Sequence, residues 1–147
     1  MEARSISQNY LAVLVAGVAC FLFEAGWYTV FLDAWLKGIG RDRGWLEHTG
    51  VNPMVQWLAA LLAEALIAGT ISGFTQLTGA QTAVRGIRVG VALWAGVVIP
   101  ISAVGDIFAV RSYASFAVDA GFWLIGMTIM GAIVGAWKKK APMEKGA

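Results

Sequence analysis

Four acidic residues stand in stretches of the sequence that are otherwise apolar, and their side chains are the best candidates for chemistry. They are Glu24, Glu64, Asp106 and Asp119. An ionisable group inside a membrane is costly, so it usually faces the interior of a helix bundle or a water-filled cavity. Carboxylates that cluster there without cations are unfavourable unless some of them are protonated or share a bound cation. The pattern therefore predicts a site for a cation or a small polar molecule.

Aromatic residues follow two of these acids at helical spacing. Trp27 and Tyr28 come three and four positions after Glu24, and side chains at such spacings share one face of a helix. Trp123 comes four positions after Asp119. A rise of about 1.5 Å per residue puts Glu24 and Asp119 at a similar depth in the outer half of the membrane, so we expect their carboxyl groups to face one another. The alternative is that each acid is separately protonated and hydrogen-bonded to nearby backbone. The predicted ligand- or cation-binding residues are Glu24, Trp27, Tyr28, Glu64, Asp106, Asp119 and Trp123.

The composition of the chain identifies the elements that must position these residues. Of the 147 residues 59% are hydrophobic and only 14% are charged, whereas a soluble domain is roughly 45–50% apolar and about 25% charged. This excludes a soluble globular protein. The gaps between charged residues are each about as long as the ~20 helical residues that cross a bilayer. The sequence therefore predicts an all-α integral membrane four-helix bundle, a single domain over residues 1–147 with spans at about 9–31, 54–77, 86–109 and 114–137.

Basic residues are unequally shared between the two sides of the expected bundle. The seven on one side are Arg4, Arg85, Arg88, Lys138, Lys139, Lys140 and Lys145, and the four on the other are Lys37, Arg41, Arg43 and Arg111. Because lysine and arginine favour the cytoplasmic side, we expect both termini in the cytoplasm and the chain in the bacterial inner (plasma) membrane. The net charge of +2 forms no patterned basic face, so no nucleic acid is expected as a partner.

Several local signals describe the connections and contacts of the spans. Residues 33–53 form the only long connection, which we expect to lie along the outer membrane interface. Asn52 and Pro53 predict the start of the second span, and Pro100 predicts a kink in the third. Three glycine pairs four residues apart predict close helix contacts in the cytoplasmic half. These pairs are Gly69 with Gly73, Gly86 with Gly90, and Gly131 with Gly135.

Four segments, taken in order, carry a resemblance to a known family. They are residues 9–16 (NYLAVLVA), 27–28 (WY), 120–124 (AGFWL) and 130–137 (MGAIVGAW). With these segments the chain resembles the small bacterial membrane proteins of domain-of-unknown-function family 1761. The resemblance implies a four-span fold and no established activity. It also implies a small residue in place of Glu24 and asparagine in place of Asp119 in typical members, so these acids would mark a subgroup.

The sequence does not favour an enzyme. It contains no Gly-rich phosphate loop, no recognisable Ser/His/Asp set and no Cys-x-x-Cys motif, and it identifies no cofactor or metal. Two interpretations remain. The first is a binding or accessory subunit with an acid- and aromatic-lined site in the outer half, and the second is a small cation or small-molecule transporter or channel. Because four short helices enclose little volume, we expect a homo-oligomer or a subunit of a larger complex in the lipid bilayer.

Overall fold

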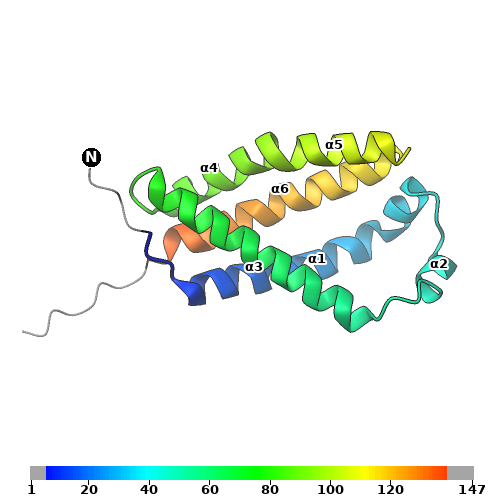
Figure 1. Cartoon of the computed structure of the whole chain (residues 1–147), viewed down its shortest axis with the longest axis horizontal. Helices are drawn as coiled ribbons and strands as arrows, with labels where there is room; N and C mark the ends of the chain where they lie inside the picture. Colours follow the sequence, from blue (N-terminus) through cyan, green and yellow to red (C-terminus); the bar gives the residue numbers. More distant parts are fainter. Residues whose placement is uncertain (1–5, 139–147) are drawn as a thin grey trace, which may run out of the picture.

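The computed structural model describes residues 6–138 of the chain. Within that range the chain forms helices and no strand, as Figure 1 shows. The elements are α1 (Tyr10–Gly38), α2 (Arg43–Glu47), α3 (Pro53–Leu77), α4 (Ala83–Leu93), the π-helical turn η1 (Trp94–Val98), α5 (Ile99–Phe108) and α6 (Tyr113–Ala136). Because α4, η1 and α5 continue one another, the described residues form four helical rods that are long and apolar enough to span a membrane. The predicted all-α membrane fold is confirmed.

Polar residues cap the start of each rod. The Asn52 side chain accepts a hydrogen bond from the Met54 backbone at 2.9 Å, and Pro53 occupies the first position of α3, where its missing N–H is not needed. Thr82 and Ser112 cap α4 and α6 in the same way. The start that the sequence predicts for the second span is therefore confirmed.

The first helix is longer than the predicted span, which ends near residue 31. α1 continues to Gly38, so the last six of its residues are helical rather than part of an interfacial connection. The reason is contact with α6. Leu36 is buried, and the Gly38 carbonyl accepts a hydrogen bond from the Ser112 backbone at 3.0 Å. The other three rods begin and end within three residues of the predicted bounds.

The two ends of the bundle carry different connections. We call them the α2 end, which also holds the α5–α6 turn, and the α3–α4 end (Figure 1). Arg85, Arg88 and Lys138 belong to the α3–α4 end. Lys37, Arg41, Arg43 and Arg111 belong to the α2 end. Arg4, Lys139, Lys140 and Lys145, which were counted for the cytoplasmic side, lie outside the described residues.

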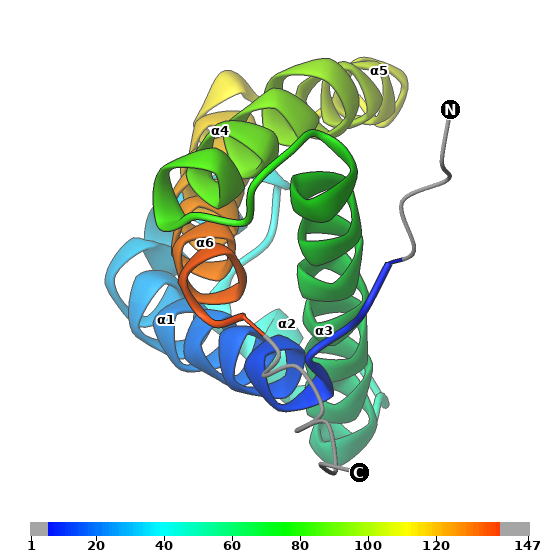
Figure 2. The ribbon, with the colours of Figure 1, turned by 90° about the vertical axis from the view of Figure 1, so that its left-hand side faces the viewer.

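Close backbone contacts join α4 to α6 near the α3–α4 end. Figure 2, viewed from that end, shows α6 between α4 and α1, with α3 to one side. A Cβ atom on Gly86 would overlap the carbonyl oxygen of Gly131, and one on Gly135 would overlap that of Thr82. A Cβ atom on Gly90 would lie 2.5 Å from the Met127 carbonyl oxygen. Two of the three predicted glycine pairs therefore do allow close helix approach.

The third predicted pair is wrong. A Cβ atom on Gly69 would lie 3.8 Å from the Val13 side chain, and one on Gly73 would lie 3.5 Å from the nearest atom, so both positions have room for a side chain. α1 and α3 instead approach through Gly17 of α1, where a Cβ atom would lie 3.1 Å from the Ala65 backbone. The glycine that allows α1 and α3 to approach closely therefore belongs to α1, and not to α3 as the sequence predicts.

The third rod is distorted ahead of its proline. Pro100 stands in the first turn of α5, directly after the π-helical turn Trp94–Val98. Proline has no N–H to donate to the preceding turn, so the regular helical ladder is interrupted there. The distortion that Pro100 predicts takes the form of this wider turn, a feature that is frequent at functional sites.

The bundle is loosely packed toward the α2 end. α3 and α5 diverge there (Figure 1), and α5 has no buried residue. Residues 53–63 of α3 also include none that is buried. In contrast, α1 and α6 remain in contact as far as Gly38, where a Cβ atom would lie 2.6 Å from the Ser115 backbone nitrogen. The open space therefore lies between the α1–α6 pair and the ends of α3 and α5.

Candidate functional site

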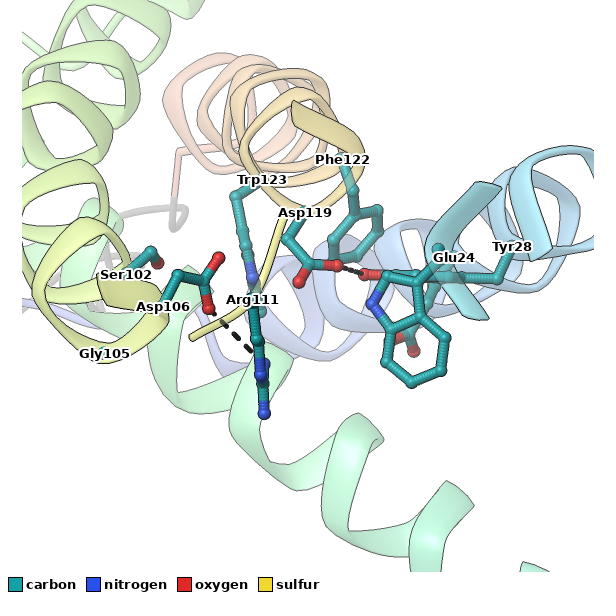
Figure 3. Close-up of a pocket in the computed structure, with 10 residues that line it drawn as sticks. Glu24, Tyr28, Ser102, Gly105, Asp106, Arg111, Asp119, Phe122 and Trp123 are labelled. Carbon is teal, nitrogen blue, oxygen red and sulfur yellow. Dashed lines mark hydrogen bonds and ion pairs between the residues drawn. The ribbon is translucent and has the colours of Figure 1, made fainter. Parts of the chain in front are cut away.

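A cavity of about 410 Å³ lies in this loosely packed part, between α1, α5 and α6 (Figure 3). α1 contributes Glu24, Tyr28 and Trp35. α5 and the turn after it contribute Ser102, Gly105, Asp106 and Arg111. α6 contributes Asp119, Phe122 and Trp123. Of the seven predicted site residues, the cavity brings together Glu24, Tyr28, Asp106, Asp119 and Trp123.

Asp119 is the anchored acid of the cavity. The Tyr28 hydroxyl donates a hydrogen bond to its carboxylate at 2.5 Å, which joins α1 to α6. The Trp35 indole, also from α1, lines the same cavity and lies close to the Asp119 carboxyl group. Its ring nitrogen is buried and has no hydrogen-bond partner among the described residues. Asp119 is thus held by a charge-assisted hydrogen bond, and a second donor lies close by.

Glu24 lies one helical turn before Tyr28 and is the acid of the cavity that has no hydrogen-bond partner. Its side chain is half-buried and makes no hydrogen bond with any residue that the structure describes. Glu24 and Asp119 line the same cavity, as the spacing predicts, but Tyr28 mediates between them and the structure shows no direct contact. The carboxyl group of Glu24 is therefore available to a ligand.

An ion pair stands on the α5 side of the cavity. The Arg111 guanidinium lies 3.5 Å from the Asp106 carboxylate, whose side chain is only 15% exposed. Arg111 is the only basic residue among those that line the cavity. Arg111 is therefore paired with Asp106 and also lies near Asp119, which leaves Glu24 as the acid of the cavity without a countercharge.

A strained turn holds this ion pair in place. Val110 connects α5 to α6 with φ of 53°, a left-handed conformation that β-branched residues avoid at a cost of about 1–3 kcal/mol. The turn allows the Arg111 backbone to donate to the Asp106 carbonyl at 3.0 Å. The Arg111 side chain is consequently kept beside the Asp106 side chain.

Two predicted site residues lie outside the cavity. The Trp27 indole donates a hydrogen bond to the Val118 carbonyl at 3.1 Å and packs over Gly121, so it fastens α1 to α6. Glu64 is 1% exposed in the core, and neither of its carboxyl oxygens has a hydrogen-bond partner in the described part of the chain. Cys20 and Glu24 are the ionisable groups near it. Neither Trp27 nor Glu64 is among the residues that line this cavity.

Replacing Glu64 by methionine is expected to raise the thermal stability of the protein in detergent. Methionine is a similar unbranched side chain, and it removes two buried oxygens whose lack of partners costs about 1–3 kcal/mol. The change Glu64→Gln is the matched control, because its amide atoms stay buried without partners and should bring no gain. Unfolding midpoints measure the effect. If Glu64→Met clearly lowers the midpoint, the carboxyl group has a stabilising partner.

The most informative site residue that the sequence analysis missed is Trp35. It was assigned to the connection at 33–53 because the first span was expected to end near residue 31. Trp35 follows Tyr28 by two helical turns, so the two share one face of a continuous helix. The sequence did contain a signal for Trp35, namely an aromatic residue seven positions after Tyr28 on the same helical face. Arg111 and Ser102 were missed because nothing in their local sequence places them at a cavity.

Four apolar rods, three of which enclose a cavity lined by acids and aromatic rings, define a multi-span helical membrane protein with a polar site. The chain belongs to the family described as protein of unknown function DUF1761, which matches residues 11–135. This confirms the family that the sequence resembles. No curated protein and no solved structure matches the chain.

Proposed function

We propose that the protein is a binding or accessory subunit of the bacterial inner membrane, and that its cavity binds a cation. The observation that carries the proposal is the cavity shared by Glu24 and Asp119, whose only basic residue is already paired with Asp106. The unpartnered Glu24 carboxyl group, together with Asp119, attracts a cation in a medium of low dielectric constant. The rings of Trp35 and Trp123 add cation–π attraction. The proposal includes no catalytic step, cofactor or nucleic acid.

The proposed orientation has both termini in the cytoplasm and the cavity toward the outer side. The excess of basic residues at the termini and at the α3–α4 turn supports it. We also propose that a second copy or a larger membrane complex accompanies the chain in the bilayer. Residues 53–63 of α3 and all of α5 include no residue that is buried, so these helix faces are free to contact another protein.

Cysteine labelling tests this orientation. A cysteine at Thr49, in the connection between α2 and α3, is expected to react with a membrane-impermeant thiol reagent in intact cells. A cysteine at Ala80, in the α3–α4 turn, should react only after lysis. The native Cys20 is buried and should give little background. Labelling of Ala80→Cys alone in intact cells would invert the proposed topology.

A thermal-stability screen tests cation binding. A ligand that binds only the folded state stabilises it by about 2.7 kcal/mol at a concentration of 100 Kd. Inorganic and organic cations are compared on the wild type, Glu24→Gln and Asp119→Asn, with Glu47→Gln of α2 as the control. At least one cation should raise the midpoint of the wild type and of Glu47→Gln, and much less that of the cavity variants. Equal shifts in all four proteins, or none in any, would exclude the cavity as the site.

Transport of a small cation or molecule is the second candidate function. The third rod, which lines the cavity through α5, contains the π-helical turn and Pro100, and such irregularities allow a helix to bend. However, the contacts of Gly86 with Gly131 close the α3–α4 end, so α4 would have to separate from α6 during transport. Uptake of the bound cation into sealed proteoliposomes would distinguish a transporter from a binding subunit.

A further inference from the structure

We infer that the ligand is a lipophilic organic cation, held with its positive charge near Glu24 and the aromatic rings and with apolar groups in a second cavity walled by tryptophan. The inference rests on the proposed function and specifies the class of ligand. It is carried by the second cavity, by the residues that the two cavities share, and by the spacing of the acids.

The second cavity has a volume of about 480 Å³ and lies between α1, α3 and the segment around α2. Its wall is largely aromatic and aliphatic, and includes Phe21, Leu32, Trp45 and Trp57. Glu24 is the only charged residue that lines it. A space of this size suits a small organic molecule, because ligand pockets are mainly apolar with a few placed polar groups.

The two cavities meet at three residues of α1. Glu24, Tyr28 and Trp35 line both of them. A positive charge at this junction would be next to a carboxyl group that has no other partner and within reach of two electron-rich rings. One side of the junction is acidic and the other apolar, so a molecule bound across it needs a positive charge and apolar groups.

An unpartnered donor at the same junction also points to a ligand. The Trp35 ring nitrogen is buried and lies near the Asp119 carboxyl group without a well-formed hydrogen bond to it or to any other residue among 6–138. Buried donors of this kind are rare and costly. A ligand that has a polar group beside its charge could accept this hydrogen bond next to Asp119.

The spacing of the acids disfavours a bare metal ion. No three His, Cys, Asp or Glu side chains in the described residues lie close enough together to hold one. Ca²⁺ takes about six to eight oxygen ligands and Mg²⁺ requires an octahedral shell, neither of which Glu24 and the rings beside it can supply. An organic cation needs no such shell, because its charge is satisfied by one carboxylate and by ring faces.

Binding of tetraphenylphosphonium to the full-length protein in lipid nanodiscs tests the inference, with tetraphenylborate as a probe of matched shape and opposite charge. Saturable binding of the phosphonium, in excess of empty nanodiscs, is expected for the wild type. The affinity should fall by about tenfold or more in Glu24→Gln and in Trp57→Leu, since each removes one half of the site. Glu47→Gln and Trp137→Leu, which alter an acid and a tryptophan outside both cavities, should bind as the wild type does.

The possible outcomes separate the inference from the proposed function. If Na⁺, Ca²⁺ or Mn²⁺ binds and depends on Glu24 while the phosphonium does not, the inference is wrong and cation binding in the cavity stands. If neither a metal ion nor the phosphonium binds, the inference and the proposed cation-binding function are both wrong. Equal binding of the borate to the wild type, or full affinity in Trp57→Leu, would also overturn the inference. The comparison of the two probes needs no variant, so it remains decisive if a substitution prevents folding.

Discussion

Replacing Gly86 by leucine is expected to prevent the bundle from forming, so that little folded protein is recovered from detergent. Any side chain at Gly86 would overlap the Gly131 carbonyl oxygen, and both are backbone positions that cannot move without separating α4 from α6. Overpacking of a well-packed core costs about 1–3 kcal/mol when side chains can adjust, and more when they cannot. The effect should exceed that range. Size-exclusion profiles and thermal unfolding of the purified protein measure it.

Two other glycines of the long helices give matched controls for this change. Gly26→Leu should be tolerated because nothing lies within 4 Å of a Cβ atom there. Gly69→Leu should also be far milder than Gly86→Leu, although the sequence pattern treats the two positions as equivalent. Equal loss of folded protein at Gly69 and Gly86 would contradict the helix packing described above.

The second large effect is expected at the bond that joins α1 to α6 inside the cavity. Tyr28→Phe removes the hydroxyl group that donates to Asp119 and leaves the carboxylate without its donor. A hydrogen bond to a charged group contributes about 1.5–3 kcal/mol, so the unfolding free energy should fall by that amount. Asp119→Asn should have a smaller effect, since the amide oxygen can still accept the bond. Denaturant or thermal unfolding in detergent measures each change.

A double-mutant cycle shows whether this bond exists. Tyr28→Phe combined with Asp119→Ala should cost less than the sum of the single changes, with a coupling of about 0.5–3 kcal/mol. The pair Glu24→Gln and Asp119→Ala is the control and should be closer to additive, because Glu24 and Asp119 share the cavity without direct contact. A strictly additive result for Tyr28 and Asp119 would show that their side chains do not interact.

The fold was largely predictable because lipid leaves few alternatives. Long apolar runs between charges must be helices, and the caps at Asn52 and Pro53 follow from the needs of a helix start. The end of α1 was not predictable in this way. Asp33 and Lys37 make residues 33–38 resemble a polar connection, whereas in the structure Leu36 is buried and the Gly38 carbonyl accepts from Ser112 at the start of α6.

The site was predictable in depth but not in direction. Counting residues along a helix places an acid at a given level, and this grouped Glu24 and Asp119 successfully. It does not fix the rotation of the helix about its axis, and Glu64 is buried outside the cavity that Glu24 lines. Positions i+3 and i+4 also differ in direction, since Tyr28 lines the cavity whereas Trp27 donates to the Val118 carbonyl.

Native mass spectrometry of the protein released from mild detergent tests the central claim most directly, namely that Glu24 and Asp119 form a cation site in the cavity between α1, α5 and α6. The wild type is expected to retain a cationic small molecule or ion, either co-purified or added, at one per chain. The double variant Glu24→Gln with Asp119→Asn should fold and lose that mass, whereas Glu47→Gln should keep it. The same spectra report a second copy or a foreign subunit. The same retained mass on the wild type and the double variant, or none on the wild type after cations are added, would contradict the claim.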